Sequence, residues 1–290
     1  MDQQIGEFLR ARRARIQPGE AGLPSYGRRR VPGLRREELA LLAGVSVDYY
    51  VRLEQGRGVN VSDAVLDAIA RVLRLDETEH EHLRDLARPG RVRTAAGRSQ
   101  RVRPEVLRML EMMDAMPAFV LGRRMDILAW NALADAVVGF GEWPEAERNT
   151  ARHTFLDPSA TTFYRDWPQV ARETVAYLRL DSGRHPGDPE LTALVEELTA
   201  RSEMFGELWA RHDVKEKTHG VKLIRHPVAG DLDFGYETLA LPGDPDQLIV
   251  TYTTVAGSPT DERLRLLTSW TAKSTEPGAH RTATRPGSVP

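Results

Sequence analysis

LRREELALLAGVSVDYYVRLEQG, residues 34–56, is the stretch of sequence that decides the fold of the N-terminal part. Apolar residues at helical spacing predict one short helix over 35–43 and a second over 47–55. Between them, Gly44 suits a tight turn and Ser46 is a good N-cap. Two short helices joined by a glycine-containing turn of about three or four residues form a helix-turn-helix, whose second helix enters the DNA major groove. The stretch therefore predicts a DNA-binding motif.

The second helix of this motif is the one expected to read DNA. Val47, Asp48 and Tyr50 would project from its N-terminal end toward base edges, and Arg52 lies one turn further on. The alternative is that residues 34–56 are simply two core helices. The predicted DNA contacts in and beside the motif are Arg35, Arg36, Ser46, Val47, Asp48, Tyr49, Tyr50, Arg52 and Arg57.

Three further helices complete the predicted N-terminal domain, residues 1–88. The first covers residues 3–16, and the next follows Ser62 as its N-cap. The last opens with a capping box between Thr78 and Glu81. Five helices in about 88 residues predict a compact all-α unit, followed over 89–103 by a basic linker.

The charge of the chain is divided unevenly between its two parts. Residues 1–103 contain 20 arginines, no lysine and 14 acidic residues, whereas the remainder is net acidic. Such asymmetry favours contact of the first part with a polyanion. The guanidinium fork also matches phosphate and guanine edges bidentately. Arg28, Arg29 and Arg30, in a loop before the motif, are further candidate DNA contacts, with a solvated basic loop as the alternative.

The second predicted domain, residues 104–272, mixes helices and strands. Strands are expected near 119–121, 126–130, 221–225, 232–241 and 247–255, and helices over 131–139, 168–180, 191–198 and 260–270. The tail over 273–290 is rich in Pro, Gly, Thr and Ser, and disorder is expected there. The fold class is thus an all-α five-helix domain followed by an α+β domain.

The motif resembles the XRE-type (Cro/repressor-like) helix-turn-helix family, over roughly residues 5–88. That resemblance implies that Arg36 contacts phosphate and that Val47 and Asp48 occupy the first base-reading positions. Arg35 stands where the family has a Ser or Thr cap, so the helix start must rely on Glu38 and Glu37. Val47 replaces a common glutamine, which favours a thymine methyl over adenine.

The run GRRRVPGLRREELA, residues 27–40, resembles a subgroup of that family that continues into an MmyB-like ligand-binding domain. Supporting stretches are MPAFV at 116–120, DILAWN at 126–131, LWARHDV at 208–214 and QLIVTY at 247–252. The resemblance implies a PAS-like sheet around a small-molecule pocket, with a fatty-acid-like ligand among the possibilities. The candidate pocket residues are Phe163, Trp167, Arg172, Arg179, Trp209, His212 and Tyr236.

Catalytic and metal-binding signals are weak by comparison. The sequence has no cysteine, no nucleophile elbow, no phosphate loop and no dinucleotide fingerprint. His212, His219 and His226 recur every seven residues, but they straddle a change from helix to strand, so the spacing does not place them on one face. We therefore expect no enzyme, no metal site and no cofactor beyond a possible apolar effector.

The sequence as a whole predicts a DNA-binding transcription regulator, a repressor, that binds a pseudo-palindromic operator as a homodimer. We expect a cytoplasmic protein, because the N-terminus lacks signal-peptide character and no apolar run approaches the ~18 residues of a membrane span. The alternative keeps the DNA-binding domain and makes the second domain a ligand-free dimerisation or partner-docking module. A third possibility, an enzyme with a DNA-binding appendage, would need a convergent set of titratable groups.

Overall fold

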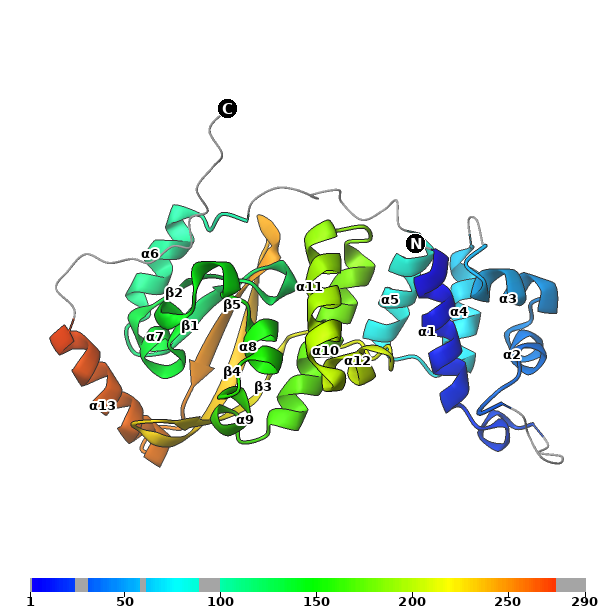
Figure 1. Cartoon of the computed structure of the whole chain (residues 1–290). Coiled ribbons are helices and arrows are strands. Elements are labelled where there is room, and N and C mark those ends of the chain that lie inside the picture. Colours follow the sequence, from blue (N-terminus) through cyan, green and yellow to red (C-terminus); the bar gives the residue numbers. More distant parts are fainter. Residues whose placement is uncertain (1, 24–30, 58–60, 89–99, 275–290) are drawn as a thin grey trace. The chain divides into compact units, whose positions relative to one another are not determined.

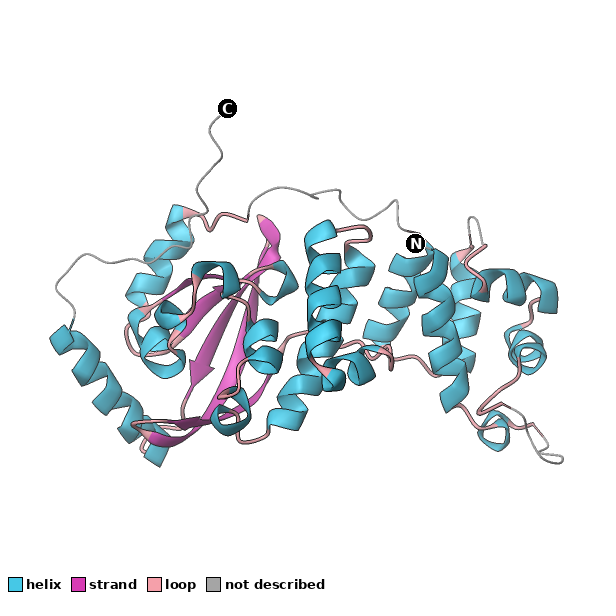
Figure 2. Cartoon of the chain, in the orientation of Figure 1, coloured by secondary structure: helices cyan, strands magenta, loops and turns pink. Residues whose placement is uncertain are grey.

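The computed structural model describes residues 2–23, 31–57, 61–88 and 100–274 (Figure 1). The chain folds into two compact units. Unit 1 consists of Met1–Ala96, Val175–Glu196 and Gly206–Glu216. Unit 2 consists of Gly97–Thr174, Glu197–Phe205 and Lys217–Pro290. The strands lie in one sheet within unit 2, whereas the described elements of unit 1 are helical (Figure 2). The α-then-α+β organisation predicted from the sequence is confirmed.

The five predicted N-terminal helices are all present in unit 1. They are α1 (Asp2–Arg15), α2 (Arg36–Ala43), α3 (Val47–Glu54), α4 (Asp63–Val72) and α5 (Glu77–Ala87), with a short 3₁₀ turn, η1 (Pro18–Ala21). Each helix contributes apolar side chains to one core, because residues three and four apart share a face. The largest of the fully buried side chains are Phe8, Leu9, Leu34, Leu39, Tyr50, Leu53, Leu66, Ile69 and Leu83.

The helix ends show which capping predictions hold. Ser62 caps α4 as predicted, and its hydroxyl accepts from the amide of Val65 at 3.4 Å. The predicted box between Thr78 and Glu81 is wrong, because α5 begins two residues earlier. Asp76 accepts from the amide of Glu79 at 2.8 Å, and the Glu79 carboxylate accepts from the amide of Asp76 at 3.2 Å.

Unit 1 also contains segments from the predicted second domain. It includes parts of three helices, α10 (Trp167–Arg184), α11 (Pro189–Arg201) and α12 (Glu203–Trp209), together with the segment that follows α12 up to Glu216. The first segment of unit 1 ends at Ala96, within the predicted linker, but the later segments of this unit were not expected in it. Sequence spacing locates helices along the chain, but it does not show which compact unit each helix completes.

Unit 2 is built on a five-stranded antiparallel sheet of order β2-β1-β5-β4-β3. The strands are β1 (Ala118–Leu121), β2 (Ile127–Trp130), β3 (His219–His226), β4 (Gly230–Leu241) and β5 (Asp244–Thr253). They match the predicted strands within a few residues. The helices are α6 (Pro104–Met112), α7 (Ala132–Val138), α8 (Thr150–Leu156), α9 (Ala160–Phe163) and α13 (Pro259–Ser274), with 3₁₀ turns η2 (Arg123–Met125), η3 (Phe140–Glu142) and η4 (Glu145–Glu147).

The two faces of the sheet have different coverings, because successive strand residues point to opposite sides. On one face, Val106 and Leu110 of α6 pack against Val120 and Ile249. The other face carries Phe119 of β1 and its register partner Trp130 of β2, and both rings contact Phe140 in the segment after α7. Apolar side chains therefore cover both faces of the sheet, and the aromatic ones gather on the second face.

Candidate DNA interface and ligand site

Helix α3 is built to present its N-terminal end. Gly44 ends α2 in the left-handed conformation (φ 68°), where glycine has no steric penalty. Ser46 then caps α3, and its hydroxyl accepts from the amide of Tyr49 at 3.2 Å. The first two residues of α3 are exposed, with Val47 44% exposed, and Arg52 follows on the outer face. Turn, cap and exposed helix start thus have the arrangement predicted for DNA reading.

The tyrosines of α3 do not share that outer face. Tyr50 is fully buried in the unit 1 core, so the prediction that its side chain projects toward base edges is wrong. Tyr49 is half-buried against the same core. The helical period explains the correction: Tyr50 shares the inward stripe with Leu53 and Glu54, and Val47 lies at its edge. The outward stripe of α3 therefore begins with Val47 and Asp48.

The last residue of α3, Glu54, has a buried carboxylate that two arginines contact. The Glu54 side chain is 0% exposed. It accepts from Arg13 Nε and Nη2 at 3.0 and 3.1 Å, and from Arg36 Nε at 2.9 Å. The α1 backbone approaches closely here, because a Cβ at Gly6 would lie 2.2 Å from the Glu54 carbonyl oxygen. This network fixes α1, the start of α2 and the end of α3 in one arrangement.

The charges of this network keep Glu54 ionised. Burial alone would raise the pKa of the Glu54 carboxyl, but the hydrogen bonds and charge of Arg13, followed by Arg36, outweigh burial and lower the pKa. Burial together with the Glu54 charge raises the pKa of the Tyr50 hydroxyl, which stays neutral. Arg36, whose side chain is 41% exposed, therefore has a structural partner in addition to any phosphate it contacts.

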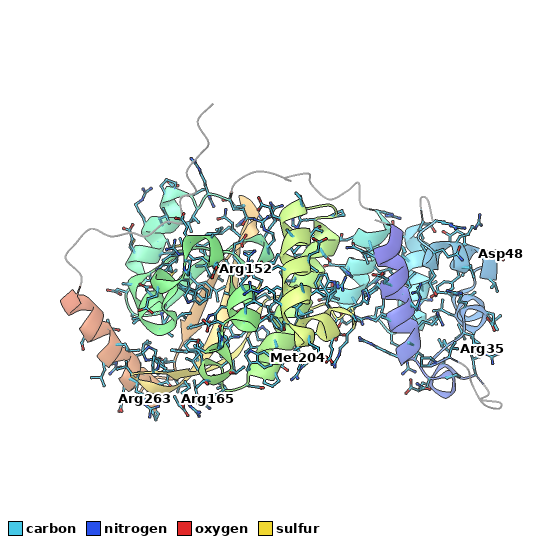
Figure 3. All side chains as sticks on the ribbon, in the orientation of Figure 1. Arg35, Asp48, Arg152, Arg165, Met204 and Arg263 are labelled. Carbon is cyan, nitrogen blue, oxygen red and sulfur yellow. The ribbon has the colours of Figure 1, made fainter. Side chains whose placement is uncertain are left out.

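The remaining predicted DNA contacts lie around the motif. The side chains of Arg35, at the start of α2, and Asp48, at the start of α3, are exposed (Figure 3). The start of α2 relies on Glu38 as predicted, and the Glu38 carboxylate accepts from the Arg35 amide at 2.7 Å. Arg57, just beyond α3, is also exposed. The triplet Arg28, Arg29 and Arg30 lies outside the described residues.

Three of the predicted ligand contacts belong to unit 1 and have packing roles there. The Arg179 guanidinium lies 3.5 Å from the centre of the Trp209 ring and donates to the Trp209 carbonyl at 2.5 Å. The carbonyl of His212 accepts from Arg12 on α1 at 2.9 Å. Burial lowers the pKa of Arg179 to about 10, partly offset by Glu7, so the side chain stays charged. The seven candidate pocket residues are therefore divided between the two units.

The same part of unit 1 packs tightly around His82 of α5. A Cβ at Gly183 of α10 would lie 2.4 Å from His82 Cε1, so only glycine leaves room for the ring. Phe8 of α1 meets the ring edge-on, with centroids 5.1 Å apart. Burial lowers the pKa of His82 to about 3, assisted by the positive charges of Arg179 and Arg12. His82 of α5 is therefore a neutral core residue that packs against α1 and α10.

The other predicted ligand contacts lie in unit 2. Tyr236 is buried and Phe163 is half-buried, and Trp167 donates from its indole nitrogen to the Thr154 carbonyl at 2.8 Å. Arg172 is exposed and bonds to Gln169 on its own helix. An exposed arginine on the helix surface is poorly placed to meet a buried ligand head group. The exposed position of Arg172 thus argues against that residue, and the assignments of Phe163, Trp167 and Tyr236 stay predictions.

The structure adds an aromatic layer that sequence reasoning missed. Ring contacts 4.4–5.9 Å between centroids run without a break from the sheet to the α8–α9 region. The sequence signal was only a scatter of aromatic residues over 119–252, because their contacts join distant segments. The members of the layer are Phe119, Trp130, Phe140, Trp143, His153, Phe163, Tyr164, Phe234 and Tyr252.

Two known protein families match the chain, one in its N-terminal part and one in the remainder. Residues 102–267 match the MmyB-like transcription regulator ligand binding domain, and residues 4–83 match a helix-turn-helix domain. The first match covers more than half of the chain.

The chain belongs to the MmyB-like transcription regulators. No curated protein matches it. As a member of this family, it is a DNA-binding transcription regulator with an N-terminal helix-turn-helix and a C-terminal ligand-binding domain. The segments Val175–Glu196 and Gly206–Glu216 lie within the ligand-binding match, yet they fold into unit 1 with the helix-turn-helix.

His226 of this MmyB-like regulator has a structural role in unit 2. His226 Nε2 bonds to the Ala136 carbonyl at 2.9 Å, and its Nδ1 accepts from the amides of Val228 and Ala229. Across the described ranges, no three His, Asp or Glu side chains converge as a metal site would require. None of the described helices has both the length and the apolar character needed for a membrane span.

Proposed function

We propose that this regulator represses transcription by binding a pseudo-palindromic operator as a homodimer, and that an apolar, fatty-acid-like molecule in unit 2 controls it in the cytoplasm. The observation that carries DNA reading is the exposed, Ser46-capped start of α3. There Val47 and Asp48 face outward, while the buried Glu54 network supports the helix from behind. A rigid helix start with solvent-facing side chains is what major-groove recognition requires.

Dimerisation follows from the size of the reading surface. One reading helix contacts only part of a helical turn, which gives little specific affinity. Dimers of this motif place two reading helices about 34–36 Å apart, and they require a site with matching two-fold symmetry. We expect the intact protein to protect such a site as a dimer. The fragment 1–103 lacks Val175–Glu196 and Gly206–Glu216, which complete unit 1, so it should bind much more weakly.

The DNA experiment compares the intact protein with the fragment 1–103 on one selected operator, with mass determined for each complex. Two copies of the intact chain per operator, and a large loss of affinity for the fragment, support the proposal. A single copy bound with full affinity would contradict the dimer. Circular dichroism of the fragment separates lost folding from lost dimerisation. Transcription from a promoter that contains the operator should fall as protein is added.

The aromatic layer of unit 2 supports the ligand proposal. Phe119, Phe140 and Trp143 link the sheet to α8 through edge-on contacts of 5.1 Å, and such surfaces favour apolar molecules. Control of DNA binding would require the ligand to favour one arrangement of the protein over another. Contacts such as the hydrogen bond from Arg12 to His212 already tie part of the ligand-binding family match to α1. The basic linker predicted over 89–103 is a second possible route for such control, and its residues 89–99 lie outside the described ranges.

Native mass spectrometry of the purified protein, before and after organic extraction, tests the ligand. We expect a mass adduct that extraction removes. The competing proposal is a ligand-free dimerisation or docking module, and it is favoured if no adduct appears and no amphiphile binds. If a ligand does control the protein, linkage requires operator DNA to change ligand affinity by the same factor as ligand changes operator affinity. A ligand that binds tightly, with an affinity that operator DNA does not change, would be a structural lipid and would contradict control by the ligand.

A further inference from the structure

His153 of α8 is a polar group enclosed in the aromatic layer of unit 2. Its ring stacks on Trp143 with centroids 4.4 Å apart and planes inclined by 21°. Phe163 and Tyr164 present their edges to the same ring at 5.9 Å. The His153 side chain is only 8% exposed. An imidazole in such apolar surroundings needs a hydrogen-bond partner for each of its nitrogens.

One nitrogen of His153 has its partner within the same turn of chain. His153 Nδ1 lies 3.1 Å from Asp157 Oδ2, and Asp157 Oδ1 accepts from the amide of Ser159 at 2.8 Å. Burial would raise the pKa of Asp157, but hydrogen bonds from Ser159 and the nearby imidazole outweigh burial and lower it. Asp157 is therefore a carboxylate that only accepts hydrogen bonds, so Nδ1 carries the imidazole proton.

The other nitrogen, Nε2, is then an acceptor. Burial lowers the pKa of His153, and Asp157 offsets that effect only in part, so the ring is neutral near pH 7. Nε2 is shielded from solvent and has no hydrogen-bond partner among the residues that the structure describes. Leaving a buried acceptor unsatisfied is unfavourable, and most buried polar groups in proteins are paired. The geometry therefore calls for a donor that this part of the chain does not supply.

We propose that His153 Nε2 accepts a hydrogen bond from the ligand of unit 2, so that the site selects an amphiphile with an uncharged hydroxyl head group. This inference rests on the proposed ligand-binding function and narrows it: the ligand keeps the long apolar chain of a fatty acid but has a hydroxyl head group in place of the carboxylate. The apolar part of the molecule would lie against the aromatic layer, and its hydroxyl would meet Nε2. A carboxylate at Nε2 is disfavoured, since two acceptors repel and the Asp157 charge lies across the ring.

Lys222 of β3 provides the competing anchor. Its ammonium lies over the ring of Tyr164 at 5.4 Å and over the ring of Tyr236 at 5.7 Å, close to the same layer. An anionic head group would use Lys222 instead of His153. The two anchors predict opposite ligand preferences, so binding can distinguish them.

The experiment titrates the full-length protein, after organic extraction, with 1-dodecanol, dodecyl methyl ether and dodecanoate, using calorimetry and tryptophan fluorescence. The ether keeps the chain and the oxygen but has no hydroxyl hydrogen. We expect the alcohol to bind about tenfold more tightly than the ether, the size of one well-formed hydrogen bond. His153→Phe keeps a stacking ring beside Trp143, removes Nε2, and should abolish that preference, whereas Lys222→Met should preserve it.

Each other outcome has a defined meaning. Equal binding of alcohol and ether to the wild type would overturn the role of His153 and leave the apolar site intact, with a buried water as the partner of Nε2. Preference for dodecanoate, lost in Lys222→Met, would assign the head group to Lys222. Failure of all three probes to bind would count against the proposed ligand function itself. Should His153→Phe not fold, the ¹⁵N signal of Nε2 in the wild type must still shift with alcohol and not with ether.

Discussion

Glu54→Gln removes one charge from the centre of the DNA-binding unit while keeping the shape of the side chain. In the wild type, the carboxylate receives two hydrogen bonds from Arg13 and is also paired with Arg36 at 2.9 Å. In the variant, two guanidinium groups share one neutral amide, and the buried Arg13 loses its counter-charge. The substitution therefore tests whether this network holds α1, α2 and α3 together.

The expected loss is large for a single isosteric change. Removing one partner of a buried ion pair costs about 3–5 kcal/mol, because the other charge stays buried without compensation. Unit 1 has more than 100 residues, and for a domain of this size about 1 kcal/mol moves the thermal midpoint by roughly 4 °C. The transition of unit 1 should therefore fall by roughly 12 °C or more. Glu77→Gln, on the exposed start of α5, is the matched control and should change little.

The pH dependence gives the prediction a sign. The pKa of Glu54 is lower in the folded protein than in the unfolded chain, so its stabilisation is present above the unfolded value. That stabilisation is lost as the pH falls through the lowered folded value. Calorimetric scans of wild type and Glu54→Gln, made at decreasing pH from pH 7, should therefore show a difference that shrinks once the pH falls below the unfolded value. Hydrogen exchange of α3 amides identifies which transition belongs to unit 1.

The reasoning would be refuted by a Glu54→Gln protein whose transition stays within about 1 kcal/mol of the wild type at pH 7, or whose deficit grows on acidification. Either result would mean that the two arginines do not depend on the Glu54 charge.

Val47→Gln should change which bases are preferred at the contacted position by about 1–3 kcal/mol per base pair, away from thymine and toward adenine, as measured by site selection. Arg52→Ala should weaken binding to all sequences and reduce the salt dependence, because we assign Arg52 to phosphate; a changed base preference would argue against this assignment. Arg36→Ala should weaken binding in the same uniform way and also lower stability, because Arg36 pairs with Glu54. Gly183→Ala should cost about 1–3 kcal/mol by overpacking against His82, seen as faster exchange of α5 amides, with base preference unchanged.

The local features of the DNA-binding motif could be predicted because they depend on residues close in sequence. Gly44 adopts the left-handed backbone at the end of α2, and Ser46 and Glu38 cap the helices that the sequence assigned to them. The turn chemistry determines these features almost alone. The same holds for the strands of unit 2, whose apolar alternation and turn residues are local signals.

The features that the sequence did not reveal depend on distant contacts. Tyr50 was expected outside because it lies in the first turn of the helix assigned to DNA reading, but core packing takes precedence at that position. Arg179 and Trp209, 30 residues apart, stack on each other in unit 1, and no spacing rule signals such a pair. His153 likewise became a candidate only when the fold brought Trp143 and Tyr164 around it.

Site selection with the intact protein, followed by base-resolved protection of the selected DNA, tests the central claim most directly. A random-sequence pool contains no assumption about the operator, and protection of major-groove atoms reports where the reading helices lie. We predict enrichment of a two-fold symmetric site, with two protected major-groove patches about 34–36 Å apart, and loss of base preference when Val47 and Asp48 are both replaced by alanine. A pool that remains random, or a preference indifferent to these two residues, would contradict the assignment of α3 as the DNA-reading helix.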